Sequence, residues 1–347
     1  MNRKTLLALS VLIIVILIIV VSEKLSNTRP PEHSLRFFPG LNENSISQIS
    51  IQGNQSSVKL TRDNNTWKVK HTAEHKDPDE STEGFIADDQ TPVYRADSAA
   101  VQTILEKIVH LRRDVLVSEN PDNQPLFEVD SESGIHVQVW DRSKSLLGSF
   151  YIGKSATDWT SHYVRLAGSN SVYTVPGGIR SSFFSDLNRW RDKRILSFDE
   201  NFASRISISG SGIDEDIVLD RTENHWNINE PVEHYAAQDS VQNMLSVLSS
   251  LNATGFENEI KDKDKLGLSQ PYLTVSVDLA TGTSHSIVIG AEKEDSNNRF
   301  IMSDIRDDVF LISSNNLSTI YADIESLKSD HPPVEEPVEE MDFSIAN

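Results

Sequence analysis

The chain has 347 residues, of which 37% are hydrophobic, and this is enough for about two packed domains of ordinary size. Its 52 acidic and 32 basic residues give a formal net charge of -20 at pH 7, so its field repels nucleic acid and we expect no nucleic-acid partner. Cysteine is absent, which excludes disulfides, thiolate metal sites and a cysteine nucleophile.

The amino terminus predicts a single-pass membrane anchor. From Thr5 to Val21 the residues are uncharged and mostly Leu, Ile and Val, and the run approaches the roughly 20 residues that a transmembrane helix needs. Arg3 and Lys4 precede it, and such cations favour a cytoplasmic amino terminus. We therefore expect a cytoplasmic tail (residues 1–4), a transmembrane helix (5–22) and a polar spacer (23–45).

The anchor predicts a bacterial inner-membrane protein whose carboxyl-terminal part lies in the periplasm. A cleaved signal peptide is the alternative, with a cleavage point before Glu23. The uncleaved anchor is favoured because the apolar run is longer than the roughly 7 to 15 residues of a signal-peptide core.

The part beyond the spacer repeats one pattern, beginning with a pair of strands around a polar turn. Four residues of the first copy return 159 positions later: Leu60, Arg62, Trp67 and Val69 become Leu219, Arg221, Trp226 and Ile228. Alternating isoleucines ahead of each set predict a preceding half-buried strand: Ile49 and Ile51, then Ile206 and Ile208. We expect the repeated tryptophans, Trp67 and Trp226, to fill the two cores.

An amphipathic helix follows in each copy. The apolar positions match at helical spacing: Val101, Ile104, Leu105, Ile108 and Leu111, then Val241, Met244, Leu245, Leu248 and Leu251. Asp97-Ser98 and Asp239-Ser240 are the expected capping residues.

Further strands complete each copy. They are expected at residues 135–140, 149–152, 163–166 and 172–175, and again at 273–277, 285–289, 300–302 and 309–312. No helix-length crossover separates them, so we predict an antiparallel meander. A short closing helix is expected at residues 183–190 and 320–327, with Asp186 matching Asp323.

The predicted fold is therefore α+β: a tandem duplicated module over residues 46–197 and 198–330, each copy mainly antiparallel strands with two helices. The first copy has 34 positions between Trp67 and Val101, whereas the second has 15 between Trp226 and Val241. This difference predicts an acidic surface-loop insertion within residues 71–92. Residues 331–347 are predicted to be a disordered acidic tail.

Two short motifs match patterns for nucleotide binding and zinc binding, but the neighbouring sequence does not predict the secondary structure that either pattern requires. Residues 148–155, Gly-Ser-Phe-Tyr-Ile-Gly-Lys-Ser, match the phosphate-loop pattern, but their interior is typical of a strand and no amphipathic helix follows. We expect no nucleotide cofactor, and we interpret Gly153, matched by Gly290, as a turn glycine at a strand end. His71, Glu74 and His75 fit H-x-x-E-H, but this segment leaves a strand and enters the acidic loop, so they are weak metal-ligand candidates.

Several short motifs resemble the family called domain of unknown function 4340 (DUF4340). They are Tyr94-Arg95-Ala96-Asp97, Ile152-Gly153-Lys154, Tyr163-Val164-Arg165, Arg191-Asp192-Lys193-Arg194 and Leu266-Gly267-Leu268. The first copy has Phe127-Glu128-Val129 where Leu-Gly-Leu is expected, and the second copy lacks the Gly-Lys and Tyr-Val-Arg motifs. The resemblance implies a single-anchor extracytoplasmic protein, or the outer part of an auxiliary subunit of a gliding-motility-type ABC transporter.

We therefore expect a non-catalytic scaffold or auxiliary protein of an inner-membrane complex, with an ABC-transporter permease as the candidate partner. The alternatives are a periplasmic metal-dependent hydrolase centred on His71, Glu74 and His75, and a module that binds a small ligand or glycan in the groove between the copies. No cofactor is expected for the scaffold.

Overall fold

The computed structural model describes residues 35–54, 56–72, 91–223, 225–321 and 323–332. The chain divides into two compact units after Asp192, which we call the first and second modules. Each contains one nine-stranded sheet in which every pairing is antiparallel. The predicted duplication of a sheet-rich module is thus confirmed.

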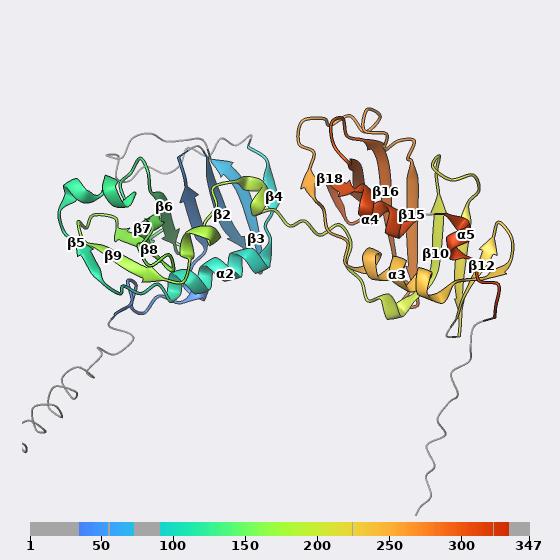
Figure 1. The fold of residues 1–347 in the computed structure, drawn as a ribbon, viewed down its shortest axis with the longest axis horizontal. Coiled ribbons are helices and arrows are strands. Elements are labelled where there is room, and N and C mark those ends of the chain that lie inside the picture. Colours follow the sequence, from blue (N-terminus) through green and yellow to red (C-terminus); the bar gives the residue numbers. More distant parts are fainter. Residues whose placement is uncertain (1–34, 55, 73–90, 224, 322, 333–347) are drawn as a thin grey trace, which may run out of the picture. The chain divides into compact units, whose positions relative to one another are not determined.

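The sheet of the first module has the order β4-β3-β2-β1-β6-β7-β8-β9-β5 (Figure 1). Its strands are β1 (Gln48–Gln52), β2 (Ser57–Asp63), β3 (Thr66–Thr72), β4 (Val93–Arg95), β5 (Leu116–Ser118), β6 (Ile135–Trp140), β7 (Leu146–Ser155), β8 (Ser161–Leu166) and β9 (Val172–Pro176).

The second module repeats this order as β13-β12-β11-β10-β15-β16-β17-β18-β14. Its strands are β10 (Ala203–Ser209), β11 (Ile217–Thr222), β12 (His225–Glu230), β13 (His234–Tyr235), β14 (Gly255–Phe256), β15 (Leu273–Leu279), β16 (Ser284–Glu292), β17 (Asn298–Ser303) and β18 (Arg306–Ser313). Ile49 pairs with Leu60 in the first module, and Ile206 pairs with Leu219 in the second, so the register is repeated as well.

One long helix packs on each sheet: α2 (Ser98–Val109) in the first module and α3 (Gln238–Ser249) in the second. The predicted apolar stripes of both helices are buried in the module cores. Trp67 and Trp226 lie in the same cores, with 6% and 4% of their surfaces exposed. Burying such stripes against the β-sheets supplies the hydrophobic free energy that a chain without disulfides needs.

The predicted caps are right for α2 and wrong for α3. Asp97 caps α2 by accepting hydrogen bonds from the amides of Ala99 and Ala100. In α3 the N-cap is Ala237, which provides no side-chain cap, and Asp239 lies inside the first turn. The reason is Gln238, whose side-chain amide bonds the main-chain N–H and C=O of Trp226 and thereby fixes an earlier helix start.

The closing helix is present only in the second module, as α4 (Ser314–Ile320) and α5 (Ile324–Leu327). The first module has 3₁₀ turns instead, η5 (Ile179–Ser182) and η6 (Leu187–Arg189). Asp186 and Asp323 still match, because each caps the turn that follows it. The remaining 3₁₀ turns are η2 (Glu43–Ser45), η3 (Pro121–Asn123), η4 (Pro125–Phe127) and η7 (Glu200–Phe202).

The folded parts begin earlier than the sequence predicts. Phe37, Phe38 and Leu41, assigned above to the spacer, pack against the core of the first module. Ile195 and Leu196, assigned to the first copy, are buried in the core of the second. Each module therefore begins several residues before its first predicted strand. The apolar residues in these segments form runs too short to show a periodic pattern, so the sequence did not reveal them.

Several predictions fall wholly or largely on residues that the structure does not describe. The anchor lies outside the described ranges, as do most of the acidic insertion and most of the carboxyl-terminal tail. Among the described residues, no helix is long and apolar enough to cross a membrane.

Candidate functional site

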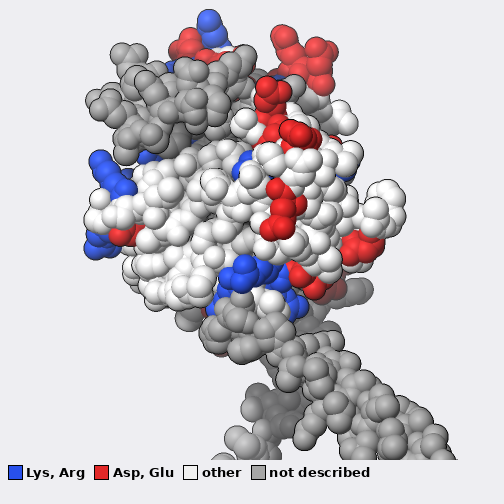
Figure 2. Space-filling model, turned by 90° about the vertical axis from the view of Figure 1, so that its left-hand side faces the viewer, with Lys and Arg blue, Asp and Glu red and all other residues white. Residues whose placement is uncertain are grey.

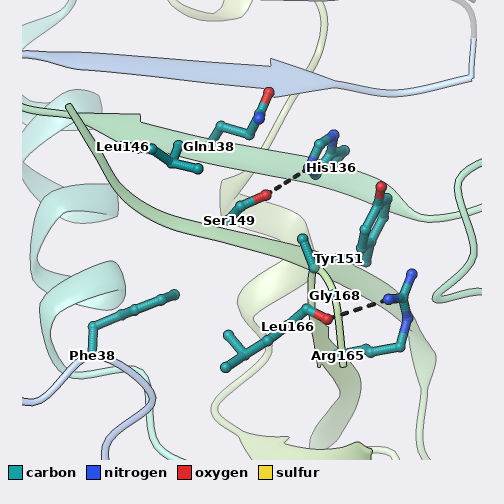
Figure 3. Close-up of a pocket in the computed structure, with 10 residues that line it drawn as sticks. Phe38, His136, Gln138, Leu146, Ser149, Tyr151, Arg165, Leu166 and Gly168 are labelled. Atoms are coloured by element: carbon teal, nitrogen blue, oxygen red, sulfur yellow. Dashed lines mark hydrogen bonds between the residues drawn. The ribbon is translucent and has the colours of Figure 1, made fainter. Parts of the chain in front are cut away.

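A row of polar side chains crosses three neighbouring strands of the first module. His136 on β6 pairs with Tyr151 on β7, and Tyr151 pairs with Arg165 on β8. Flanking residues of opposite parity, such as Val137, Phe150 and Val164, are buried in the core, so the row lies on the other face of the sheet. Figure 3 shows the three side chains projecting from that face.

The three side chains form a stack with Tyr151 in the middle. The rings of His136 and Tyr151 are stacked, with centroids 4.3 Å apart and planes inclined by 8°. The guanidinium carbon of Arg165 lies 4.5 Å from the Tyr151 ring centroid, within the range of a cation–π contact. Since neighbours cover both sides of the Tyr151 ring, a bound molecule would contact the polar rims of the stack.

Arg165 is held by the main-chain oxygens of three residues. Its Nε donates to the carbonyl of Val129 at 2.8 Å, and its Nη1 donates to the carbonyls of Leu166 and Ser169 at 3.2 and 3.1 Å. Only 7% of the residue is exposed. These bonds fix the guanidinium in place, so its orientation does not depend on a ligand.

The carboxylate of Asp130 attracts the Arg165 guanidinium electrostatically. Its Oδ1 accepts hydrogen bonds from the amides of Glu132 and Ser133. These bonds lower the pKa of Asp130 against the opposing effect of its burial, which keeps the group ionised at neutral pH. Asp130 Oδ2 is buried and has no hydrogen-bond partner among the described residues.

The stack carries one positive charge at neutral pH. Burial, with a smaller contribution from the charge of Arg165, lowers the pKa of His136 to about 4, so its imidazole is neutral. Burial raises the pKa of the Tyr151 phenol, which therefore remains protonated. Burial also lowers the pKa of Arg165, but a guanidinium starts so high that it stays charged.

A shallow pocket of about 530 Å³ opens beside this stack. Its polar lining includes Gln138 and Ser149, and the Ser149 hydroxyl lies 2.8 Å from Nε2 of His136 (Figure 3). Its apolar lining includes Phe38, Leu146 and Leu166. The pocket therefore combines one buried cation and several hydrogen-bonding groups with an apolar wall.

The phosphate-loop pattern lies in strand β7, so its backbone has the extended form expected of a strand. Gly153 is inside this strand, where an added Cβ would collide with the carbonyl oxygen of Phe127. Gly290 is likewise inside β16, where an added Cβ would collide with the carbonyl oxygen of Leu266. The interpretation of these residues as turn glycines is therefore wrong: close approach of a crossing segment requires glycine at both positions.

The two segments that cross these glycines, Phe127-Glu128-Val129 and Leu266-Gly267-Leu268, occupy corresponding places in the two modules. Glu128 and Gly267 both have positive φ angles, +56° and +67°, in corresponding places. Glycine adopts this conformation freely, whereas Glu128 adopts it at some cost. Val129 and Leu268, which follow them, are buried in small satellite cores.

The H-x-x-E-H motif begins on a strand. His71 is an exposed residue of β3, paired with Val58 of β2, so it is not on the helix that this pattern requires. Glu74 and His75 lie outside the described residues. In the described ranges, no group of three or more metal-ligating side chains is present.

Two of the family-like motifs contact each other. The Arg191 guanidinium lies 3.6 Å from the Tyr94 ring centroid, and Arg95 pairs with Asp192 at 3.3 Å. Asp97 also donates its amide to the carbonyl of Trp190, at 2.7 Å. These residues bind the end of the first module to the start of α2, so the structure gives them a packing role.

The second module has no equivalent of the stack. Thr274, Val288 and Met302 are paired across β15, β16 and β17 at the positions that correspond to His136, Tyr151 and Arg165. The correspondence follows from the matched glycines, since Tyr151 and Val288 each lie two residues before them. His136 and Tyr151 belong to no recognised binding motif and were not predicted as site residues, although a strand-by-strand comparison of the two copies reveals this difference.

The chain belongs to the DUF4340 family, a domain of unknown function, whose model matches residues 89–271 and 226–331. These matches together cover more than half of the sequence, and they confirm the family that the motifs resemble. No curated protein and no solved structure matches the chain.

Proposed function

We propose that this protein is a non-catalytic, membrane-anchored periplasmic scaffold that binds a protein subunit of an inner-membrane complex through the edge strand β5. The candidate partner is the permease of an ABC-type transporter. The observation that carries the proposal is an apolar strand edge on a strongly acidic chain.

Strand β5 and the residue before it expose a run of apolar side chains. Val115 is 58% exposed, and Leu116 and Val117 in β5 are 46% and 38% exposed. Figure 2, which shows the side of the first module on which β5 lies in Figure 1, shows a broad area without charged residues. Exposed apolar side chains gathered on one strand edge are typical of an interaction site.

The backbone of β5 can also take part in binding. It is the last strand of its sheet and pairs only with β9 among the described strands, so its other edge is open to a further strand. The corresponding β14 of the second module is different, because its Phe256 is only 7% exposed. The apolar edge is thus a property of one copy and is not needed for the fold.

The edge lies next to the point where the chain enters the first module. The Phe37 amide donates to Leu111 and the Arg113 amide donates to Leu35, both at 2.9 Å, just ahead of β5. If the run ending at Val21 is the anchor, the connection to Leu35 can span at most roughly 50 Å. With such an anchor, β5 would lie within reach of the outer surface of a membrane protein.

Photo-crosslinking in intact membranes tests the proposal. A photoreactive amino acid at Val115 is expected to crosslink a membrane protein, which mass spectrometry would identify. The same amino acid at Val93, 56% exposed on the opposite edge strand β4, is the matched control and should give no such product.

Charge substitution then tests whether the edge contributes affinity. Leu116→Glu should reduce co-purification of the crosslinked protein about tenfold, because a carboxylate would be buried in the contact. Val93→Glu should leave it unchanged. Two results would refute the scaffold proposal. One is that the native chain captures no stoichiometric membrane protein, and the other is that the Leu116→Glu variant captures the same protein as well as the native chain does.

A further inference from the structure

We propose that the pocket beside the His136–Tyr151–Arg165 stack binds the carboxylate of a small monoanionic ligand that carries an apolar substituent. The inference does not depend on the proposed scaffold function, because the residues that line the pocket are not those of the edge strand β5.

The first step is the charge of the pocket. Arg165 is the one ionised side chain among the described residues that line it, and no carboxylate is part of that lining. Asp130 acts on the guanidinium from outside the pocket, and its Oδ1 is already bonded to two amides. A buried cation without an ion-pair partner gains most from an anion that reaches it from the pocket.

The second step is the donor pattern. The Tyr151 ring lies between the neutral His136 ring and the Arg165 guanidinium, as Figure 3 shows. When the Ser149 hydroxyl donates to Nε2 of His136, the ring proton lies on Nδ1 and is available to a ligand oxygen. The guanidinium and the phenol, which are neighbours in the stack, thus offer donors to one planar anion, and the imidazole adds a donor farther along the rim.

The charge count favours a carboxylate over a phosphate dianion. One guanidinium, already partly compensated by the ionised Asp130, can balance at most one further negative charge, and the stack contains no second cation at neutral pH. The chain as a whole has a net charge of -20, which disfavours each additional negative charge on a ligand.

The apolar wall determines the rest of the ligand. Phe38, Leu146 and Leu166 also line the pocket, with Phe38 and Leu166 packed against the module core, and contact with these side chains would favour a ligand that carries a hydrocarbon substituent. Leu146 is 54% exposed at the start of β7, and a ligand would cover surface that is otherwise in contact with water.

The two modules provide an internal contrast. The structure of the second module is maintained with Thr274, Val288 and Met302 at the positions of the stack, so the fold does not require a histidine, a tyrosine or a buried arginine there. Their presence in the first module alone is what a binding site in that module predicts.

Isothermal titration calorimetry on the full-length chain in lipid nanodiscs tests the inference, with sodium hexanoate as the probe. We expect saturable binding in the millimolar range. Hexanamide has the same shape without the charge and should bind at least about tenfold more weakly. Inorganic phosphate should compete poorly with hexanoate.

Substitutions at Leu146 report on the pocket without disturbing the groups that hold Arg165. Leu146→Glu should weaken hexanoate binding several-fold, and Leu146→Lys should strengthen it, because the new charge would lie at the pocket wall. Leu126→Glu is the matched control: Leu126 is 60% exposed, is not part of the lining and should leave binding unchanged. Arg165→Met should abolish binding, with circular dichroism to verify that the variant folds.

Three results would overturn the inference. They are an absence of saturable hexanoate binding, equal binding of hexanoate and hexanamide, and an affinity that does not respond to the sign of the charge at Leu146. Tighter binding of phosphate than of hexanoate would refute the assignment of the ligand as a carboxylate.

Discussion

Gly153 and Gly290 occupy equivalent places in the two modules, each on a strand that another segment of backbone crosses at close range. The carbonyl oxygens of Phe127 and Leu266 occupy the space that a Cβ would need. Because the obstacle is backbone, a side chain cannot rotate away to relieve the clash.

Gly153→Ala and Gly290→Ala should therefore each lower the free energy of unfolding, by about 2 kcal/mol or more. Urea denaturation followed by circular dichroism would measure the loss. Gly282→Asn is the control, because Gly282 has nothing within 4 Å of its ideal Cβ and asparagine tolerates its φ of +86°. A loss equal to that of the control would show that the crossing segments can move aside.

The missing cap of α3 offers a stabilising substitution. Ala237→Asp should raise the free energy of unfolding by about 1 kcal/mol, because the carboxylate can accept the free amides of the first turn as Asp97 does in α2. The reverse change, Asp97→Ala, should lower the stability by a similar amount. Thermal unfolding of the two variants would measure both effects. If Ala237→Asp lowered the stability, the aspartate would not be capping α3 as expected.

Acidification should destabilise the first module through His136. Its pKa of about 4 lies below the ordinary value of 6.5, so the fold favours the neutral ring. This contribution is complete above pH 6.5 and is lost as the pH falls toward 4, with an upper limit of about 3 kcal/mol. The stability of the native chain should therefore fall more steeply between pH 6.5 and about 4.5 than that of His136→Gln, which keeps a hydrogen-bonding group but does not titrate. If the free energy of unfolding of the native chain and of His136→Gln changed in parallel with pH, the His136 ring would have the same pKa in the folded and unfolded chains, which would contradict this prediction.

The two cores should respond alike to matched cavities. Leu60 and Leu219 correspond in the duplicated pattern, and both are fully buried. Replacing either leucine with alanine should cost about 2–5 kcal/mol, because a large side chain is lost from a packed core. Ile305→Ala, at a residue that is 49% exposed, should cost much less. Chemical denaturation would compare the three, and a small effect at one leucine alone would mean that the cores differ in packing.

The duplicated architecture was predictable because it depends on the spacing of apolar residues. The hairpin around Trp67 and its return around Trp226 determine the register, and glycines and polar turns separate the later strands. The short edge strands, such as β4 and β13, were not predicted. A strand of two or three residues is too short to show the alternation of apolar and polar residues by which strands are recognised. The cap of α3 was wrongly placed because Gln238 bonds with a strand that is distant in sequence.

The candidate pocket could be predicted only in fragments. Arg165 belongs to a family-like motif, and Tyr151 lies inside the phosphate-loop pattern, but neither shows a binding role in the sequence alone. The site depends on cross-strand pairing that brings residues 136, 151 and 165 together, and pairing follows from turns and bulges that one sequence does not specify.

The pairing of residues 35–37 with residues 111–113 has a mechanical consequence. Tension applied through the amino-terminal segment enters the first module at Leu35 and acts first on the two backbone hydrogen bonds to Leu111 and Arg113. Residues 111–113 lead directly into β5. A pull on the amino-terminal segment is therefore borne next to the apolar strand, and a load at that strand is transmitted back to Leu35.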